Sequence, residues 1–451
     1  MPSAALSGQL TLQAAERAQG IRYKSLPPEV VGLAKHCILD FVALMLVGAK
    51  EPLIRILTEE ALSQGGIAES SAVACAARLP AQWAATINSA AGHVLAYDDV
   101  NMVIPGHGTA VAWPAVFALA ERDGRSGTDV IAAYVAGFET VGAIGALVEP
   151  SHYDRGFHAS ATIGTFGAAA AAGHLLGLKG ATFAQAISLA GSMAAGLKGV
   201  FGTPLKPFQV SRAAGNGVLA ANLAARGLTG RTNILEAPQG FLATQTEVSA
   251  EGTLPQPPDG YYLRGTLFKY HAACYLAHSP IECARLLRAQ PDWDERKVAR
   301  IVVRGNPMCD KVCNIQEPGT GPEIGYSIRT LVAMGLRGLD TGRPDSLDPA
   351  VLHDPALIML RDKISVGFDQ SLTETAAVVT ATMQDGRELT ASDDVGLPVT
   401  DRENQAARLR GKFDTLVSPL LGPDRTGALR QHILALETLP SVGPIAGLLR
   451  H

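Results

Sequence analysis

The residues best suited to chemistry surround two long uncharged stretches near the middle of the chain. The segment 151–217 ends in three basic residues set among glycines, Lys198, Lys206 and Arg212. Between His158 and Gly177 the only ionisable side chains are those of His158 and His174. So much uncharged helix is typical of the interior of a fold. Polar groups at the ends of buried helices are suited to an anion, which predicts a pocket for an anionic ligand here.

Two further polar features precede this segment. Asp98 and Asp99 follow a predicted helix and come before a loop rich in proline and glycine. His107 lies in that loop, immediately before a helix predicted to begin near Thr109. The positive end of a helix dipole disfavours an imidazolium, so we expect His107 to be neutral and able to act as a base. The alternative for the two aspartates is a solvated pair that caps a helix.

A second histidine and two lysines complete the candidate site. His158 begins an uncharged helix, and burial there favours its neutral form, although a histidine buried only for packing is the alternative. Lys206 (GTPLKP) and Lys269 (LFKY) lie in turn-like segments with few acids nearby. Single lysines are usually solvated, but these two together supply the cations that a di- or tricarboxylate needs.

The motifs of several other enzyme classes are absent from the sequence. It contains no HExxH, no paired Cys/His cluster, no Walker loop, no G-x-G-x-x-G after a strand and no G-x-S-x-G. The six cysteines are scattered and are expected to be free or structural thiols rather than metal ligands or disulfides. Acid/base chemistry without a cofactor or a metal is therefore the expectation for an enzyme.

Composition indicates a large, well-packed protein with two domains. The chain has 451 residues, of which 47% are hydrophobic and 18% are charged. The net charge of −4 gives no reason to expect a nucleic acid or an anionic membrane as a partner. The N-terminal residues lack a basic stretch followed by an apolar one, so we expect a cytoplasmic protein. The apolar runs 159–176 and 181–197 are broken by small polar residues and predict buried helices rather than membrane spans.

Hydrophobic spacing divides the chain into a long helical part and a mixed part. Helical patterns occupy 8–20, 27–50, 52–64, 80–96, 110–121, 127–148, 159–176 and 181–197. A linker rich in proline and glycine follows at 250–262. Helices are then predicted at 271–290, 323–339 and 349–362, and strands at 297–305, 364–368, 375–383 and 388–392. Asp385-Gly386 between the last two strands predicts a hairpin. From about residue 400 the pattern is helical again and is expected to pack onto the first domain.

The sequence resembles the MmgE/PrpD family, which includes 2-methylcitrate dehydratase, cis-aconitate decarboxylase and iminodisuccinate epimerase. The resemblance spans nearly the whole chain. Five segments carry it in order: NSAAGHVLAYDDV (88–100), HGTAVAWPAVFALAE (107–121), RGFHASATIGTFGAAAAAGHLLGL (155–178), GTPLKPFQVSRAAGNGVLAANLAARGLTG (202–230) and EIGYSIRTLVA (323–333).

The resemblance implies a mainly α fold with a helical domain (1–266 plus 399–451) and a smaller α/β (α+β) lid domain (267–398). It also implies a homodimer without metal or cofactor and an active site between the two domains. By position, residues that match the family's pocket are His107, His158, Lys206 and Lys269, and Tyr326 matches the aromatic position before its serine, here Ser327.

Several positions depart from the family's pattern. Where the family commonly has D-[FY]-D-D-[TS]-H, this chain has Ala96-Tyr97-Asp98-Asp99-Val100-Asn101. The histidine of the family's K-P-x-H-x-G is Gln209, its H-P is His107-Gly108, and a lysine often found before the aromatic is Gly325. The changes at Ala96, Val100 and Gly325 each remove a polar group that a hydroxy-tricarboxylate could contact, so these changes bear on which reaction the protein performs.

We therefore expect a lyase that removes a proton next to a carboxylate of a di- or tricarboxylic acid, as 2-methylcitrate dehydratase does. One of His107 and His158 is the base and the other the acid, and Asp98 orients a histidine or a lysine. Lys206 and Lys269 hold carboxylates, with Tyr326, Lys198 and Arg212 as further substrate contacts. The alternatives are an epimerase, a cis-aconitate decarboxylase-like enzyme, or a paralogue that binds a carboxylate without catalysis.

Overall fold

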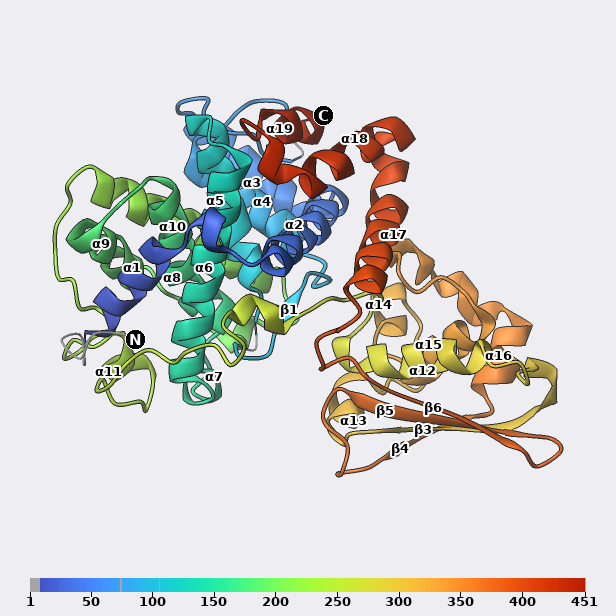
Figure 1. Ribbon diagram of the computed structural model, residues 1–451. Coiled ribbons are helices and arrows are strands. Elements are labelled where there is room, and N and C mark those ends of the chain that lie inside the picture. The colour runs from blue at the N-terminus through green and yellow to red at the C-terminus, as the bar shows by residue number, and fades with distance from the viewer. Residues whose placement is uncertain (1–8, 74, 105, 451) are drawn as a thin grey trace. The chain divides into compact units, whose positions relative to one another are not determined.

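The computed structural model describes residues 9–73, 75–104 and 106–450, and it divides the chain into two compact units. The helical unit comprises Met1–Thr266 and Leu409–His451, and the mixed unit comprises Leu267–Arg408 (Figure 1). The sequence placed the return to the first domain at residue 399. In the structure the boundary falls inside helix α17 (Arg402–Leu421), since a continuous helix runs through it.

Helices form almost the whole helical unit. They are α1 (Leu10–Gly20), α2 (Pro28–Gly48), α3 (Pro52–Gln64), α4 (Ala81–His93), α5 (Gly108–Asp123), α6 (Gly127–Val148), α7 (Ser151–Asp154), α8 (Ala159–Leu175), α9 (Gly180–Gly191), α10 (Leu205–Ala225), α11 (Phe241–Gln245), α17, α18 (Pro423–Leu434) and α19 (Gly443–Leu449). The two-residue strand β1 (Val100–Asn101) lies between α4 and α5, and β2 (Thr266–Leu267) lies at the unit boundary. This confirms the predicted mainly helical first domain.

Helix α8 is the centre of this unit, and small residues let its neighbours approach it closely. Its residues are buried except for His174, and α5, α6 and α10 pack around it. A Cβ atom on Gly217 of α10 would lie 2.4 Å from the Cβ of Ala168, and one on Gly167 would lie 2.1 Å from a methyl carbon of Val141 in α6. Larger side chains at either glycine would push the helices apart.

Two predicted helices of this unit end earlier than the sequence indicated. The helix predicted at 80–96 ends at His93, because Ala96 adopts a left-handed conformation with φ of 51°. The helix predicted at 181–197 ends at Gly191. The chain after Gly191 instead packs on the start of α8, where Gly196 accepts a hydrogen bond from the backbone N–H of His158 at 3.0 Å. Because these helices end early, the loops after His93 and after Gly191 lie beside the candidate site.

The mixed unit contains a four-stranded sheet with the order β4-β3-β5-β6, in which β3 and β4 are parallel and the other pairs antiparallel. Its strands are β3 (Val298–Gly305), β4 (Ile364–Phe368), β5 (Ala376–Met383) and β6 (Glu388–Asp394). Its helices before α17 are α12 (His278–Arg288), α13 (Met308–Cys313), α14 (Gly321–Ile324), α15 (Ile328–Arg337) and α16 (Pro355–Arg361). The predicted hairpin is confirmed, with Gly386 in its turn at φ of 86°.

Three helix predictions in the mixed unit were wrong in extent, and the one at 349–362 is divided into the 3-10 helix Pro349–His353 and α16. The helix predicted from residue 271 begins at His278, because a short 3-10 helix, Tyr275–Ala277, precedes it. The helix predicted at 323–339 is divided into α14 and α15. The break occurs at Ser327, which has an extended backbone and is the residue that precedes α15. This break leaves Tyr326 in a short connection between α14 and α15, where the residue is 45% exposed.

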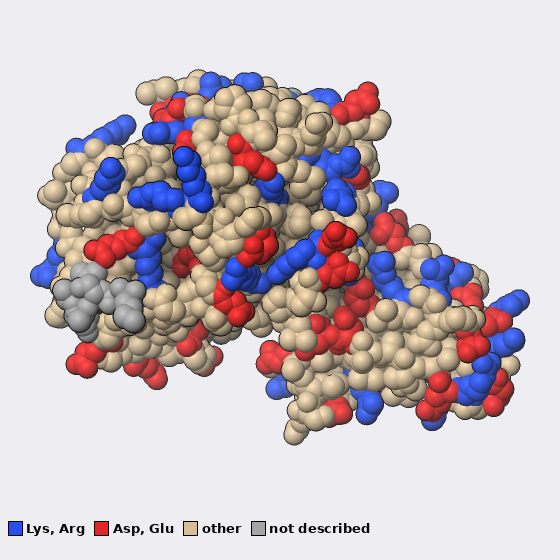
Figure 2. Space-filling model, viewed as in Figure 1, with Lys and Arg blue, Asp and Glu red and all other residues tan. Residues whose placement is uncertain are grey.

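Two described helices, α2 and α6, are long and apolar enough to cross a membrane by length and composition alone. In each, 83% of the apolar window is buried inside the protein, which is typical of core helices. On the face seen in Figure 2, basic and acidic side chains are interspersed over both units, and neither sign covers either of them.

Candidate active site

Three long helices of the helical unit begin at the candidate site. His107 is the residue that precedes α5, His158 precedes α8, and Lys206 lies in the first turn of α10. The backbone N–H of His107 donates to Oγ of Ser160 in α8 at 3.1 Å. Gln209 of α10 lies 2.6 Å from the His158 ring. The positive ends of three helix dipoles therefore meet near these two histidines, which favours an anionic ligand.

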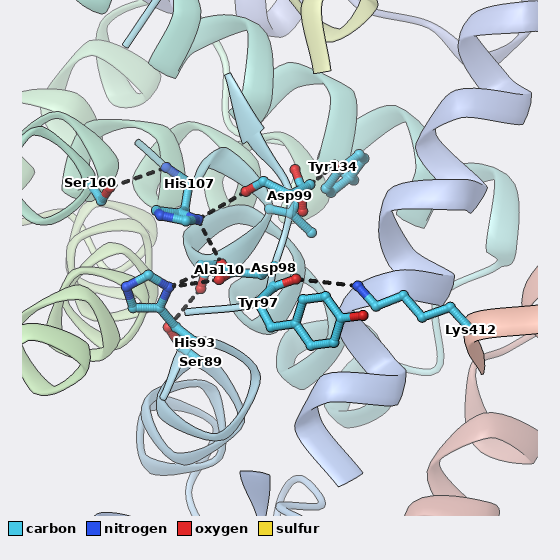
Figure 3. A network of polar contacts seen from close by, with 11 residues as sticks. Ser89, His93, Tyr97, Asp98, Asp99, His107, Ala110, Tyr134, Ser160 and Lys412 are labelled. Carbon is cyan, nitrogen blue, oxygen red and sulfur yellow. Dashed lines mark hydrogen bonds and ion pairs between the residues drawn. The ribbon is translucent and has the colours of Figure 1, made fainter. Parts of the chain in front are cut away.

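Asp98 joins His107 to another histidine, His93, at the end of α4 (Figure 3). The Nδ1 atoms of His93 and His107 each lie 3.0 Å from Oδ2 of Asp98. Nδ1 of His107 also lies 2.9 Å from the carbonyl oxygen of Asp99. Carboxylate and carbonyl oxygens only accept hydrogen bonds, so Nδ1 carries the proton in both rings. In a neutral ring the basic nitrogen is then Nε2, which makes His107 suited to exchange a proton with a substrate.

Asp98 is the anion that fixes both rings. Burial opposes its ionisation, but the charges and hydrogen bonds of His107 and His93 outweigh burial and hold the pKa of Asp98 well below its usual value. Its carboxylate stabilises a positive charge on either imidazole. The prediction that Asp98 orients a histidine therefore has a geometric basis, although nothing in the sequence analysis singled out His93. The only sequence sign of His93 is its place five residues before Asp98.

His158 has the opposite proton arrangement. Oε1 of Gln209 accepts the backbone N–H of Leu197 at 3.0 Å, and Nε2 of Gln209 donates to the carbonyl oxygen of Leu197 at 3.1 Å. This pair fixes which end of the amide carries hydrogen, so Gln209 donates to Nδ1 of His158. The proton of the neutral ring is then on Nε2. Burial, followed by the nearby His93, Lys206 and His107, lowers the pKa of His158 to about 2. His158 is thus a neutral hydrogen-bond donor rather than a base.

We expect Gln209→Glu to reverse this proton arrangement. A carboxylate only accepts, so it would draw the proton to Nδ1 of His158 and leave Nε2 without a hydrogen to donate. Activity should fall by about 10- to 100-fold, the cost of roughly 1.5–3 kcal/mol for one hydrogen bond to a charged group. Nitrogen NMR of the labelled ring reports the tautomer directly. Gln209→Asn, which keeps an amide, is the control, and a Gln209→Glu protein with full activity would show that the tautomer does not matter.

Lys206 is the basic residue that lies with these histidines. Burial lowers its pKa, and the charge of Asp98 partly offsets that effect. Its ammonium nitrogen lies 5.8 Å from the centre of the Phe201 ring, on which His158 packs edge-on. A partly desolvated ammonium attracts a carboxylate more strongly than a solvated one.

The other two cations predicted in this region contact different groups. Nζ of Lys198 donates to the carbonyl oxygen of Tyr153 at 2.8 Å and lies 3.5 Å from the centre of its ring. Arg212 donates to Oδ1 of Asn216 at 3.1 Å, one turn further along α10. Their roles as substrate contacts stay predictions.

A buried lysine of α17, Lys412, contacts the segment that carries Asp98. Lys412 of α17 forms an ion pair with Asp40 of α2 at 2.6 Å, and its ammonium lies 3.7 Å from the centre of the Tyr97 ring. It also donates to the carbonyl oxygen of Tyr97 at 3.2 Å (Figure 3). Lys412 and Asp40 are buried. No local pattern indicates this contact, because Lys412 and Tyr97 are separated by 315 residues.

Asp99 lies in the same segment. Its Oδ2 accepts a hydrogen bond from Thr109 at 2.8 Å, and the Thr109 hydroxyl lies 2.8 Å from that of Tyr134. Burial and the charge of Asp98 raise the pKa of Asp99 well above its usual value. Asp99 is therefore a buried structural carboxyl, and the alternative that the two aspartates form a solvated capping pair is wrong, because both are buried.

The mixed unit contains the two remaining predicted residues. Lys269 is 6% exposed, and its ammonium lies 5.9 Å from the centre of the Tyr275 ring. Tyr326 lies between α14 and α15, and its carbonyl oxygen accepts the backbone N–H of Ile315 at 3.0 Å. Ser327 is buried, and its hydroxyl lies 2.9 Å from that of Thr330.

The side chains of His93, Asp98 and His107 could also bind a metal ion. Ligand atoms of His93, Asp98 and His107 all lie within 4.8 Å of one another. Two imidazoles and a carboxylate are a common ligand set for divalent transition metals. In the structure, however, the short Nδ1–Oδ2 distances are satisfied as hydrogen bonds. The expectation of a metal-free enzyme stays a prediction.

A cavity of about 200 Å³ lies elsewhere in the helical unit, between α1, α6 and residues 256–262. Its lining includes Arg17 and Glu139 but none of the predicted site residues. Burial raises the pKa of Glu139 to about 7, although the carboxylate accepts the backbone N–H groups of Tyr262 and Leu263. These contacts anchor the segment that leads out of the helical unit.

Comparison with known proteins identifies the family. Residues 13–250 match the MmgE/PrpD N-terminal domain, and residues 271–438 match the MmgE/PrpD C-terminal domain. The chain is 27% identical to the cis-aconitate decarboxylase-like protein oryM of Aspergillus oryzae, over 98% of this chain and 97% of that protein. It is 27% identical to a cis-aconitate decarboxylase of Aspergillus terreus, over 96% and 94%, and 25% identical to the human cis-aconitate decarboxylase, over 98% and 94%. Since the two domain matches together cover most of the chain, it belongs to the MmgE/PrpD family.

Proposed function

We propose that this protein is a lyase that decarboxylates an unsaturated tricarboxylate of the cis-aconitate type. The observation that carries the proposal is the opposite proton arrangement of His107 and His158 beside Lys206. One ring can exchange a proton through Nε2, and the other can only donate a hydrogen bond there. The relatives named above are cis-aconitate decarboxylases or similar to them by name, so decarboxylation takes precedence over the dehydration that the sequence favoured.

The electrostatics support a substrate with several carboxylates. Three helix N-termini and the ammonium of Lys206 provide positive potential in a region where the nearest anion, Asp98, is already shared by two histidines. An anionic substrate would be attracted there, and the low local dielectric would strengthen each contact. Lys269 and Tyr326 of the mixed unit are proposed to contact the same substrate.

The residues fit the charge that decarboxylation creates. When CO₂ leaves the CH₂ carbon, the electron pair of the broken bond forms a new double bond with the central carbon. The original double bond then becomes an enediolate on the neighbouring carboxylate. Lys206 and the Nε2–H of His158 stabilise that charge. His107, as an imidazolium held by Asp98, delivers the proton from Nε2 to the carbon and completes the reaction.

The other reactions on this scaffold would use the same groups differently. A dehydratase or an epimerase needs His107 as a base, removing the proton that a decarboxylase would add. The two differ in the next step, because one loses hydroxide and the other regains a proton on the opposite face. The product therefore decides between these alternatives.

Proton NMR of the purified protein in D₂O tests the proposal. Separate samples would contain cis-aconitate, 2-methylcitrate, citrate and iminodisuccinate, each with and without EDTA. We expect cis-aconitate to lose CO₂ and to give a dicarboxylate with a new terminal methylene and one deuterium beside a carboxylate, with or without the chelator. Turnover of another acid alone would contradict the decarboxylase assignment. Binding of all of them without turnover would indicate a carboxylate-binding paralogue. A homodimer in the cytoplasm is part of the proposal, and light scattering checks the dimer.

A further inference from the structure

A buried asparagine, Asn101, connects the loop between α4 and α5 to the segment that leads out of the helical unit. Its Nδ2 donates to the carbonyl oxygen of Tyr262 at 2.9 Å, and its Oδ1 accepts the backbone N–H of Val103 at 3.0 Å. The backbone N–H of Asn101 donates to the carbonyl oxygen of Gly106 at 3.0 Å, directly before His107. Asn101 therefore closes this loop on itself and ties it to a residue 161 positions further along the chain.

Helix α6 holds the loop and the segment side by side through three positions spaced three residues apart. Glu139 accepts the backbone N–H groups of Tyr262 and of the next residue, each at 2.9 Å. A Cβ atom on Gly142 would lie 2.3 Å from Cγ of Tyr262, and one on Gly145 would lie 1.7 Å from a methyl carbon of Ile104. Such positions share one face of a helix. Asn101 thus bonds two pieces of chain that both pack closely on this face of α6.

The same loop determines where the His107 ring lies. Nδ1 of His107 lies 3.0 Å from Oδ2 of Asp98 and 2.9 Å from the carbonyl oxygen of Asp99. Asp99 comes two residues before Asn101, and Gly106 comes directly before His107. The contacts of Asn101 therefore lie between the ring and its two acceptors along the chain. A displacement of the loop would change both distances.

We propose that Asn101 is a positioning residue for proton delivery by His107, because its amide fixes the loop on the carbonyl of Tyr262. An amide carries one acceptor and an N–H₂ donor in a single plane, and the two contacts use both. An amide also does not titrate, so this tie is the same wherever the protein is folded. The positioning of His107 stands on the structure alone, whereas its effect on turnover rests on the proposed function.

Asn101→Ser tests the proposal, because it removes the contact with Tyr262 and little else. A serine hydroxyl can still accept the backbone N–H two residues further on, here that of Val103. It ends where the amide carbon of asparagine would lie, so it does not reach the carbonyl oxygen of Tyr262.

Asn306→Ser is the matched control. Asn306 of the mixed unit makes the same pair of contacts, since its Oδ1 accepts the backbone N–H of Met308 at 2.9 Å and its Nδ2 donates to the carbonyl oxygen of Leu372 at 2.8 Å. The same substitution there breaks an equivalent tie in a different part of the chain. Thermal unfolding of both variants reports the stability that each tie contributes.

NMR of the full-length protein labelled with ¹⁵N at histidine measures the state of His107 without any substrate. We expect a slowly exchanging Nδ1–H signal of His107 in the wild type, assigned by its loss in His107→Asn. This signal should shift or broaden in Asn101→Ser and stay unchanged in Asn306→Ser. The Nδ1–H of His152, which donates to the carbonyl oxygen of Gln245 at 3.1 Å, is the internal reference. Absence of the His107 signal from the wild type, or an unchanged signal in Asn101→Ser, would overturn the proposal.

Steady-state kinetics with cis-aconitate measure the effect on the reaction. We expect kcat of Asn101→Ser to fall by about 10- to 100-fold, the loss that a displacement of about 1 Å can cause. KM should stay within about 2-fold, because Asn101 acts on the proton donor rather than on the substrate carboxylates. Equal losses of kcat in Asn101→Ser and Asn306→Ser, or a changed His107 signal with unchanged kcat, would overturn the role in the reaction. A protein that turns over none of the acids would refute the proposed function, and the NMR signal would still decide whether Asn101 positions His107.

Discussion

Replacing His107 with asparagine is expected to lower kcat by about 10²- to 10⁴-fold, the usual contribution of a positioned acid or base. The asparagine amide can still donate to Asp98 in place of Nδ1, so the loop should keep its structure. It has no counterpart of Nε2 that can gain and lose a proton. Steady-state kinetics with cis-aconitate, together with the thermal stability of the variant, measure the two effects separately.

His93→Asn is the matched control, because His93 makes the same 3.0 Å contact with Asp98. His93→Asn should lower kcat far less, by about 10-fold, because His93 acts through Asp98 rather than on the substrate. Equal losses in the two variants would contradict the distinct role given to His107. His158→Gln should leave the shape of the pH–rate profile unchanged, because a pKa of about 2 keeps His158 neutral above that pH.

Replacing Lys412 with methionine is expected to destabilise the helical unit by about 3–5 kcal/mol, the usual cost of leaving one partner of a buried ion pair without the other. Asp40 would keep a buried charge without the ammonium of Lys412 opposite it. Urea unfolding at neutral pH, followed by circular dichroism, measures the change in the free energy of unfolding.

The double variant Asp40→Leu/Lys412→Met should recover most of this loss, because it removes both charges together. If the free energy of unfolding of Lys412→Met is within about 1 kcal/mol of the wild-type value, this ion pair contributes no more than an ordinary surface pair. If the double variant is no more stable than the single one, Lys412 acts mainly through its contacts with Tyr97 rather than with Asp40.

Local patterns in the sequence predicted the elements well where one periodicity dominates. The spacing of apolar residues in α2, α6 and α8, and the Asp-Gly turn between β5 and β6, depend only on neighbouring residues. The positions of His107 and His158 immediately before helices followed from glycine-flanked loops beside apolar runs. Predicted helices were wrong where a tertiary contact overrode propensity, as at Gly196, which packs on α8 rather than continuing α9.

The functional arrangement of the site was only partly predictable. The sequence singled out Asp98, His107, His158 and Lys206, but not which nitrogen of each ring carries the proton. That property depends on Gln209 and Leu197, which meet His158 only after α8 and α10 have packed. Gln209 stands where the family has a histidine, and in the structure its amide fixes which nitrogen of His158 carries the proton. His93 and Lys412 were missed because their contacts depend on chain folding rather than on spacing.

The return of the chain at Leu409 has a consequence for how the protein is made. Lys412, which supports the Asp98 loop, is near the end of the sequence, whereas Asp40 and Tyr97 are near its beginning. During synthesis, the ribosome releases the loop and both histidines long before it releases the lysine that holds them from behind. The mixed unit, Leu267–Arg408, is translated in between. The contacts that hold Asp98 and the two histidines are therefore complete only when synthesis of the polypeptide is almost finished. A chain truncated before α17 contains every candidate catalytic residue but lacks Lys412.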